Sequence, residues 1–436
     1  IRVVLQNQPV CRIYINLCHN LTFVMPRRKV AFVHPDLGIG GAERLVLDVA
    51  GALASQGDEV IFLTNHFDKS HAFEELKRGD FPVYVYGDWI PRSVFGRFQA
   101  FCAYIRMTYL VFVYALFYRG EQKPHLYFVD LIPVAVPILK LFKEKVIYYC
   151  HHPDLLASSP GGTLKKIYRK PIDWVELKST KKADIVLVNS EYTASVFRQT
   201  FPEIDKPIQV VYPTVAYSYL EAVKKVTNPR PMVEIVPKLP SNASCVFLSI
   251  NRFHPAKQLE LAVLGMDRLR QITSPDEWKG IYLIVAGGYD PQSRINATYL
   301  NELLHLTREC KLEDKIVFLK SPNDDLKTEL LIACDCLIYT PTKEHFGIVP
   351  LEAMTVSKPV IACNSGGPRE TVDHGNTGYL CEPTPESMAR FMYKIYKTDT
   401  KEMGLKGKEI LEKKFSNESF AKNLTQIIDS INKKQI

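Results

Sequence analysis

Short apolar runs alternate with amphipathic stretches along the chain from Lys29 onward. Lys29–His34 and Glu59–Thr64 have the continuous apolar character of buried strands. Between them, Ala42–Ala54 repeats its apolar residues at helical spacing behind a glycine loop, Gly38–Gly41. The same pattern predicts four further strands in this half: Pro82–Tyr86, His125–Val129, Lys145–Cys150 and Asp184–Asn189. Continuous apolar strands that alternate with helices indicate a parallel sheet that is buried on both faces.

The pattern begins again near residue 243, after a proline-rich polar segment between Asn228 and Pro240. The strands expected here are Ser244–Asn251, Ile281–Ala286, Ile316–Leu319, Cys336–Thr340 and Pro359–Cys363, and the helices are Leu259–Ile272, Tyr299–Cys310, Leu326–Cys334 and one that begins with Pro350–Thr355. We therefore predict an α/β protein with two Rossmann-like, doubly wound domains that face a central cleft. Ligands of such sheets bind at the carboxyl ends of the strands.

These patterns also set the expected domain boundaries. Residues 25–225 form the N-terminal domain, 226–242 a linker, 243–410 the C-terminal domain, and 411–436 a C-terminal helix that packs back toward the N-terminal domain. Residues 1–24 fit neither domain, because Ile1 is not an initiator and Met25 directly precedes a basic run and the first strand. We interpret residues 1–24 as a non-native or upstream extension and Met25 as the natural start.

Charge is distributed unevenly along a chain of ordinary globular composition. The 436 residues are 46% hydrophobic and 23% charged, with a formal net charge of +8. Ten basic residues lie close together in the sequence: Lys140, Lys143, Lys145, Lys165, Lys166, Arg169, Lys170, Lys178, Lys181 and Lys182. Such a run is most often a solvated face. Because no nucleic-acid-binding motif accompanies it, an anionic membrane surface or a phosphorylated acceptor is the better functional interpretation, and no nucleic-acid partner is expected.

Cysteine usage favours a reducing, cytosol-facing location. Ten cysteines spread over 436 residues do not resemble a disulfide framework, and no Cys or His pair has zinc-ligand spacing, so no metal site is expected. Five glycosylation sequons (Asn20, Asn242, Asn296, Asn417 and Asn423) would fit a lumenal protein, but the motif is frequent by chance.

One apolar stretch stands apart from the sheet pattern. Met107–Tyr118 holds twelve consecutive uncharged residues, fewer than the roughly 20 that span a bilayer. It is either a buried core helix or a helix in the membrane interface. A run of this length is usually a buried core helix, but the arginines on either side, Arg106 and Arg119, and aromatics such as Phe112 and Phe117 fit the second interpretation equally well, so both stay open.

Two elements of the predicted N-terminal domain carry candidate chemistry at the cleft. The run Gly38-Ile39-Gly40-Gly41-Ala42-Glu43 follows a strand and opens a helix, where glycines and free N–H groups suit a diphosphate. A dinucleotide fingerprint would need glycine in place of Glu43, which weakens a dehydrogenase interpretation. His151 and His152 close another strand. Either could bind zinc, but no third ligand is apparent at a suitable local spacing, and contact with a sugar hydroxyl or a diphosphate is the alternative.

The predicted C-terminal domain supplies three more candidate elements. Arg252 and Lys257 follow its first strand, where two cations could neutralise a departing diphosphate. Glu344 lies in a loop and Glu352 in the first turn of the next helix, so that one carboxylate could reach a ligand ring and the other vicinal hydroxyls. The turn Ser365–Pro368 follows a strand, and its backbone amides could bind an anion.

Taken together, these elements resemble the retaining GT-B glycosyltransferases. The loop Gly38–Glu43, the Arg252 and Lys257 pair, the E-x7-E element Glu344–Glu352 and the S-G-G-P turn stand in that family's order over residues 29–430. Five segments (Phe32–Val46, Tyr148–Leu156, Tyr168–Trp174, Val285–Asp290 and the run E-H-F-G-I-V-P-L-E-A-M) look more narrowly like the dolichol-pathway mannosyltransferases that add an α-1,3 and then an α-1,6 mannose to Man-GlcNAc2-PP-dolichol.

The resemblance implies GDP-mannose as donor, a dolichol-pyrophosphate-linked oligosaccharide as acceptor, and no metal or other cofactor. It also implies action at the cytosolic face of the endoplasmic reticulum membrane, with other transferases of the pathway as further candidate partners. The catalytic residues it implies are Glu344, Lys257, Arg252 and His151. The donor-binding residues are Gly40, Gly41, His345, Phe346, Gly347, Ile348, Val349 and Glu352, and the residues toward acceptor or membrane are Gly38, Met107, Phe112 and Phe117.

Two further interpretations remain open from the sequence. One is a GT-B enzyme that uses a UDP-sugar or builds a different glycolipid, and assays with GDP-mannose against UDP-sugars would separate it. The other is an inert membrane-bound scaffold on the same fold. A scaffold would be expected to have lost the donor-site residues Arg252, Lys257, Glu344 and Glu352, and all four are present.

Overall fold

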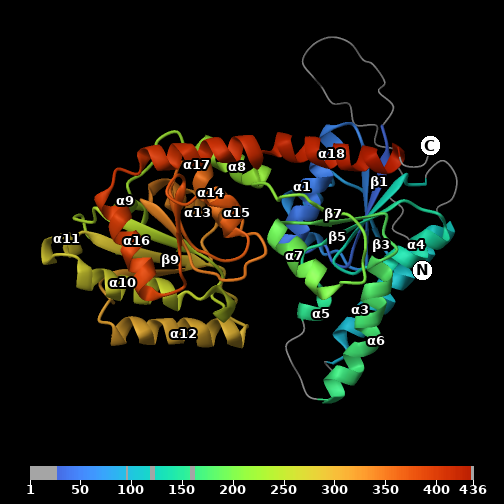
Figure 1. Ribbon diagram of the computed structural model, residues 1–436, viewed down its shortest axis with the longest axis horizontal. Helices are drawn as coiled ribbons and strands as arrows, with labels where there is room; N and C mark the ends of the chain where they lie inside the picture. Colours follow the sequence, from blue (N-terminus) through green and yellow to red (C-terminus); the bar gives the residue numbers. More distant parts are fainter. Residues whose placement is uncertain (1–26, 95–96, 118–122, 158–162, 434–436) are drawn as a thin grey trace, which may run out of the picture.

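A computed structural model describes residues 27–94, 97–117, 123–157 and 163–433, which form two α/β domains side by side (Figure 1). The first contains a seven-stranded parallel sheet in the order β3-β2-β1-β4-β5-β6-β7. Its strands are β1 (Lys29–His34), β2 (Glu59–Thr64), β3 (Val83–Val85), β4 (Leu126–Asp130), β5 (Val146–Cys150), β6 (Ile185–Val188) and β7 (Ile208–Val210). Its helices are α1 (Gly41–Ser55), η1 (Lys69–His71), α2 (Glu74–Arg78), α3 (Gln99–Phe117), α4 (Ala135–Leu141), α5 (Asp154–Ala157), α6 (Thr163–Thr180) and α7 (Glu191–Thr200).

The second domain contains a six-stranded parallel sheet in the order β10-β9-β8-β11-β12-β13. Its strands are β8 (Cys245–Ile250), β9 (Ile281–Gly287), β10 (Ile316–Lys320), β11 (Cys336–Tyr339), β12 (Val360–Cys363) and β13 (Gly378–Cys381). Its helices are α8 (Tyr217–Lys225), α9 (Met232–Ile235), η2 (Pro255–Lys257), α10 (Glu260–Ile272), α11 (Pro275–Lys279), α12 (Arg294–Glu309), α13 (Asp324–Ala333), α14 (Val349–Thr355), α15 (Pro368–Thr371), α16 (Pro385–Lys397) and α17 (Lys401–Lys414), and α18 (Asn417–Lys433) follows.

Both sheets are buried on their two faces, as the continuous apolar runs predict. In β1, Val30 and Phe32 pack on the side of α1, whereas Ala31 and Val33 pack on the opposite side, because successive side chains of a strand point to opposite faces. The predicted strands are confirmed to within about two residues. The sequence patterns missed β7 and β13, which are short edge strands with weak apolar character, since β7 holds Gln209 and β13 begins at Gly378.

The proline-rich segment is packed against the second domain, which corrects its description as a linker. Tyr219 of α8, Met232 of α9, and Val236 and Leu239 after it are buried in the same apolar core as strands β8 and β11. Residues 217–239 therefore belong structurally to the second domain, although the sequence prediction divided them between the first domain and a linker.

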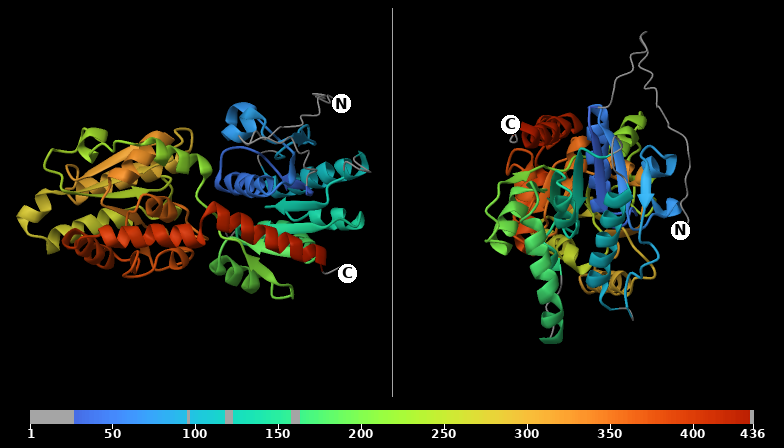
Figure 2. Two further views of the ribbon diagram at one scale, coloured as in Figure 1. Left: turned by 90° about the horizontal axis from the view of Figure 1, so that it is seen from above. Right: turned by 90° about the vertical axis from the view of Figure 1, so that its right-hand side faces the viewer.

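The last helix crosses back to the first domain (Figure 2). Apolar residues of α18 at helical spacing, among them Leu424 and Ile428, are buried in one core with Leu45 and Val49 of α1. Arg28 adds an ion pair to Asp429 at 2.7 Å. The C-terminal helix thus fastens the two domains together over the top of the molecule in Figure 1.

Helix α3 has one buried and one exposed face, so the buried-core interpretation holds for one face and the membrane-interface interpretation stays a prediction for the other. Met107 and Leu110 are fully buried in the core, whereas Phe112 and Phe117 are exposed. Among the described residues, α3 is the one helix whose length and apolar composition would suffice to cross a membrane. Arg106 is buried and bonds to the carbonyl of Asn65, so it does not border a membrane surface, and Tyr118 and Arg119 lie outside the described residues, as does the whole 1–24 segment.

Candidate active site

Loops at the carboxyl ends of β8 and β11 bring two of the predicted catalytic residues, Lys257 and Glu344, into contact. The Lys257 ammonium group, which follows β8, pairs directly with the carboxylate of Glu344, which follows β11. The backbone of the two loops is held as well, because the Thr340 hydroxyl donates to the Lys257 carbonyl at 2.6 Å. Both charged side chains remain partly exposed, 19% for Lys257 and 25% for Glu344, so a ligand can reach them.

The S-G-G-P turn, Ser365–Pro368, packs against the backbone of the loop that carries Glu344. The Gly367 N–H donates to the Glu344 carbonyl at 2.8 Å, and a Cβ on Gly367 would lie 2.3 Å from the Phe346 Cα. Gly366 has φ +65 and would carry a Cβ 2.3 Å from the Glu344 carbonyl oxygen. The two glycines are therefore required for close backbone packing. The expectation of an anion-binding nest at this turn is corrected for Gly367, since its amide is already bonded.

Glu352 occupies a buried position in the first turn of α14. Its Oε1 accepts a hydrogen bond from the Lys327 Nζ at 2.6 Å, whereas its Oε2 is buried and has no hydrogen-bond partner among the described residues. A buried carboxylate oxygen without a partner is costly, and a ligand hydroxyl would satisfy it. Lys327 comes from α13, and its position inside an ordinary amphipathic helix gave no sequence signal of this contact.

Arg252 lies exposed at the end of β8. Its Cγ would be 3.2 Å from a Cβ on Gly288, so the small residue in the β9 loop leaves room for the arginine side chain. No acidic partner of Arg252 occurs in the described parts of the chain. Arg252 follows the same strand as Lys257, and its exposed guanidinium is available for an anionic ligand.

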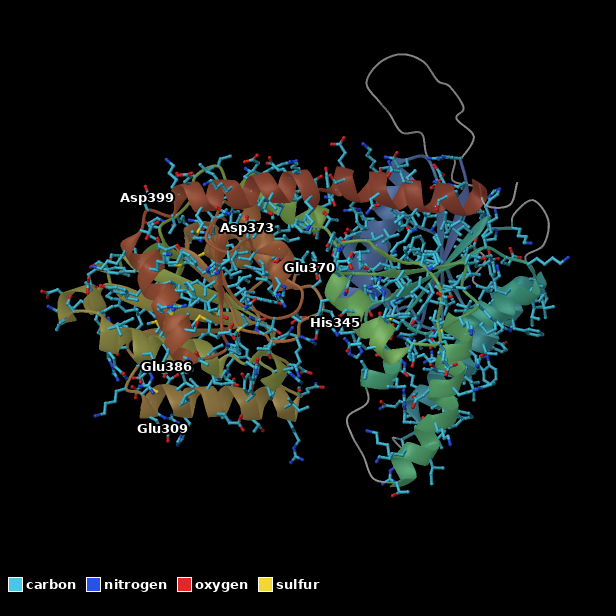
Figure 3. The ribbon with its side chains drawn as sticks, viewed as in Figure 1. Glu309, His345, Glu370, Asp373, Glu386 and Asp399 are labelled. Carbon is cyan, nitrogen blue, oxygen red and sulfur yellow. The ribbon has the colours of Figure 1, made fainter. Side chains whose placement is uncertain are left out.

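His345 lies where the two domains meet (Figure 3). Its Nδ1 is 2.8 Å from the Thr193 hydroxyl, its carbonyl accepts a bond from Ser190, and its ring meets that of His152 edge-on, with centroids 4.4 Å apart. Burial first, and then the neighbouring His152, lower the pKa of His345 to about 4. The His345 imidazole is therefore neutral at physiological pH and joins the two halves of the site.

Glu370 provides a second contact between the domains, at the place labelled in Figure 3. Its two carboxylate oxygens accept hydrogen bonds of 2.9 Å from the backbone N–H groups of Glu191 and Tyr192, at the first turn of α7. An acceptor at a helix N-terminus is favourable both as a cap and with the helix dipole. Sequence reasoning missed Glu370, because its partners are backbone groups 178 and 179 residues away.

The remaining donor-binding candidates divide into packing and turn residues. The Phe346 side chain is buried against the rings of Tyr212 and Phe415, which corrects its expected role as a donor-binding side chain. Gly347 has φ +82 and turns the chain into α14 beneath Tyr339. Ile348 and Val349 begin that helix and are partly buried in the core of the second domain.

On the side of the first domain, the glycine loop leads into α1. Gly40 is the N-cap residue of α1, and a Cβ there would lie 2.3 Å from Glu43 Oε2, whereas a Cβ on Gly41 would meet nothing within 4 Å. Gly38 has only ordinary contact distance to His71. A side chain at position 40 would therefore require the Glu43 carboxylate to shift, whereas one at position 41 would meet no other atom. His151 follows β5, with its Nε2 at 2.8 Å from Asp130 Oδ1.

Of the three residues expected at the membrane, two are exposed. Phe112 is 50% and Phe117 76% exposed on α3. The prediction for Met107 is corrected, because its side chain is 0% exposed and faces the sheet. Among the described residues, no three His, Cys, Asp or Glu side chains gather as a metal-ion ligand set.

The fold and site define a glycosyltransferase of GT-B architecture, and sequence comparison agrees. Residues 39–218 match the family model described as Glycosyltransferase Family 4, and residues 234–429 match that described as Glycosyl transferases group 1. The chain is 42% identical over 412 residues to alpha-1,3/1,6-mannosyltransferase ALG2 of Mus musculus, covering 92% of this chain and 96% of that protein. It is 36% identical over 443 residues to its counterpart in Saccharomyces cerevisiae, covering 93% and 85%. The chain belongs to the alpha-1,3/1,6-mannosyltransferase ALG2 family.

Solved structures agree on the fold. Sucrose-phosphate synthase from Thermosynechococcus elongatus superposes with a TM-score of 0.72 at 20% identity, covering 94% of this chain and 100% of that one. Anabaena Alr3699/HepE in complex with UDP superposes with a TM-score of 0.68 at 18% identity, covering 92% and 100%. At such identities the comparison establishes architecture alone.

Proposed function

We propose that the protein transfers mannose from GDP-mannose, with retention of configuration, to Man-GlcNAc2-PP-dolichol. It adds the α-1,3 mannose and then the α-1,6 mannose, giving Man3GlcNAc2-PP-dolichol at the cytosolic face of the endoplasmic reticulum. The observation that carries the proposal is the Lys257–Glu344 ion pair at the carboxyl ends of β8 and β11. Family membership supports the sugar and the two linkages, since the relatives are named for them.

In the proposed reaction, the bond between the mannose C1 and the β-phosphate oxygen of the donor breaks, and a new bond forms between C1 and an acceptor hydroxyl oxygen on the same face. The hydroxyl proton passes to the departing phosphate, so that GDP is released. Negative charge grows on the diphosphate as its bond breaks. Arg252 and Lys257 stabilise that charge, which is the kind of electrostatic contribution that lowers a transition state most.

The carboxylates have positioning roles in this scheme. Glu344 contacts the mannose, and Glu352 receives the ribose hydroxyls of the donor through its buried, unpartnered Oε2. His151 contacts the sugar from the first domain. Because Arg252 and Lys257 neutralise the diphosphate in this scheme, it requires no metal ion, and activity is expected to survive EDTA.

Exposed faces on α3 and α6 support the proposal that the protein acts at a membrane surface. The two helices lie next to each other and α6 extends beyond the first domain (Figure 1), with the Tyr168 hydroxyl bonded to the Phe101 N–H at 3.1 Å. On α6, the exposed Ile167 and Trp174 share one helical face with Lys166 and Lys170. An apolar face with aromatic and lysine side chains suits an anionic lipid surface.

The proposal is tested by incubation of the protein with GDP-mannose and a short-chain Man-GlcNAc2-pyrophosphate lipid, followed by linkage analysis. Two products are expected in sequence, first with the α-1,3 mannose and then with both mannoses. Parallel reactions with UDP-glucose should give no product. Absence of transfer from GDP-mannose, or transfer from UDP-glucose instead, would refute the proposal.

A further inference from the structure

A buried chain of charged side chains links the glycine loop to His151. Asp130 Oδ2 lies 2.9 Å from His34 Nδ1, and Asp130 Oδ1 lies 2.8 Å from His151 Nε2. On the far side of His34, its Nε2 lies 3.5 Å from Glu43 Oε1. His34 is 0% and Asp130 1% exposed, so the chain passes through the interior of the first domain.

The alternation of side chains along three neighbouring strands explains how these residues meet. Strands β1, β4 and β5 are adjacent and parallel in the sheet. Residues two positions earlier (Phe32, Phe128 and Tyr149) all belong to the core on the α1 side of the sheet. Because side chains repeat with a period of two, His34, Asp130 and His151 point to that same side at the carboxyl ends. Glu43 enters from the first turn of α1, which covers this face.

The charges in the chain alternate. Burial by itself would lower the pKa of His34, but hydrogen bonds and charges from Asp130 and Glu43 raise it to about 9. Burial would raise the pKa of Asp130, but His151 and His34 lower it to about 2. At neutral pH, Glu43 and Asp130 are ionised and His34 between them is protonated. Asp130 is therefore a fixed carboxylate held against His151.

The contacts are close but not fully aligned. Although His151 Nε2 and Asp130 Oδ1 are 2.8 Å apart, both atoms are buried without a hydrogen bond of acceptable angle, and the same holds for His34 Nε2. The 2.8 Å separation lies in the usual range of a charge-assisted hydrogen bond between a ring nitrogen and a carboxylate. Catalytic hydrogen bonds commonly align only when the substrate is bound.

Gly40 leaves space for the Glu43 side chain. A Cβ at position 40 would lie 2.3 Å from Glu43 Oε2, so any side chain there would displace the carboxylate that faces His34. Gly40 has an extended backbone, with φ −162, so its conformation does not require glycine. A side chain at position 40 would therefore require the flexible Glu43 carboxylate to move from its place beside His34.

We propose that Asp130, supported by His34 and Glu43, is a positioning residue that fixes the ring of His151 with its proton on Nε2. The other nitrogen, Nδ1, is then the one left to accept a hydrogen bond from a substrate hydroxyl. A carboxylate that sets the tautomer and orientation of a working histidine is a well-established arrangement in enzymes. The inference rests on the proposed function, because it assumes that His151 contacts the substrate.

A double-mutant cycle tests the proposal through kcat. We expect Asp130→Asn to lower kcat about 10-fold to 100-fold with little change in the KM for GDP-mannose, and His151→Ala to lower kcat at least as much. In the His151→Ala background, Asp130→Asn should then have no further effect, because it acts only through His151. Additive losses, or no loss from either single change, would overturn the proposal.

Asp184→Asn is the matched control. Asp184 precedes β6 at the opposite end of the same sheet, where it accepts bonds from Lys140 and the Val146 N–H. Its loss should lower thermal stability but leave kcat unchanged. If Asp130→Asn fails to fold, Glu43→Gln at the partly exposed end of the chain replaces it, with an expected loss of a few-fold that also vanishes without His151.

Nitrogen-15 NMR of the histidine side chains provides a readout that does not depend on transfer activity. The proton of His151 should reside on Nε2 in the wild type, and Asp130→Asn should produce a mixture of the two tautomers. A wild type that transfers no mannose would refute the proposed function and with it the catalytic use of His151. An active enzyme with the His151 proton on Nδ1 would refute the positioning role alone.

Discussion

The candidate site has two sides, one contributed by each domain, which we call its two walls. The two walls differ in how their charged residues are held. In the second domain, Lys257 and Glu344 lie on loops and pair with each other at partly exposed positions. In the first domain, His34 and Asp130 are buried at the ends of strands and held on both sides. The exposed pair can exchange partners when a diphosphate arrives, whereas the buried chain cannot rearrange without uncovering a charge.

Because of this difference, we expect the two walls to have different roles in the reaction. A lysine that is paired with a carboxylate in the free enzyme can turn to a phosphate at small cost, because both partners remain near water. The second domain therefore adapts to the donor. The first domain presents a fixed histidine to the sugar, and fixed dipoles and charges stabilise a transition state without reorganisation.

Removal of the Lys257 side chain is expected to have the largest effect on kcat. Lys257→Ala should lower kcat about 10²-fold or more, because the charge that develops on the diphosphate loses a stabilising partner. Single-turnover transfer from radiolabelled GDP-mannose measures it. Lys279→Ala is the control and should be silent, because it removes an exposed lysine paired with Asp276 on α11, at the end of the second domain away from the first (Figure 1). Near-normal turnover of Lys257→Ala would mean that the second domain does not stabilise the leaving group.

A smaller effect is expected at the buried carboxylate. Glu352→Gln keeps the shape of the side chain but removes its charge and its ion pair to Lys327. If Oε2 accepts donor hydroxyls, the KM for GDP-mannose should rise about 10-fold while kcat changes little, since the ribose does not react. Calorimetric titration with GDP separates this binding role from chemistry. A fall in kcat at constant KM would instead place Glu352 in the transition state.

The sequence predicted the second wall better than the first. Glu344 to Glu352 and Arg252 to Lys257 are local runs, so their spacing could be interpreted directly. His34 and Asp130 are 96 residues apart and meet only because β1 and β4 are neighbours, which a single sequence does not reveal. Glu43 was noticed only as a departure from a dinucleotide motif.

The fold followed closely from the alternation of apolar runs, with exceptions that have physical reasons. The edge strands β7 and β13 are short and weakly apolar, and the proline-rich segment packs on the second domain through isolated residues such as Met232. Glu370 and Lys327 were missed because each reaches its partner from a separate helix.

Removal of exposed apolar side chains from the first domain is expected to lower activity on a membrane-bound acceptor a few-fold. The same kind of change in the second domain should have no such effect. Ile167→Ser combined with Trp174→Ser removes two side chains that are 65% and 60% exposed on α6. Activity on acceptor in vesicles with anionic lipid should fall several-fold, while activity on a short-chain acceptor in solution is unchanged. Leu405→Ser, at a 53% exposed position on α17, is the control. An equal loss with both acceptors would indicate damage to the fold rather than to membrane binding.

The smallest predicted effect is a difference in pH dependence between the two walls. His34, which faces Asp130 and Glu43, has its pKa raised to about 9, so its stabilising effect is complete below its ordinary pKa of 6.5 and is lost as the pH rises through about 9. His345, buried beside His152, has its pKa lowered to about 4, so its effect is complete above 6.5 and is lost as the pH falls toward 4.

Thermal unfolding of the variants at acid, neutral and alkaline pH measures this difference. Relative to neutral pH, the gap in Tm between wild type and His345→Asn should narrow at pH 5, and the gap to His34→Asn should narrow above pH 9. Each change is expected to be a few degrees at most, because one histidine contributes little to so long a chain. Gaps that do not vary with pH, or that narrow in the reverse order, would show that the two histidines do not carry the opposite charge states on which the comparison of the walls depends.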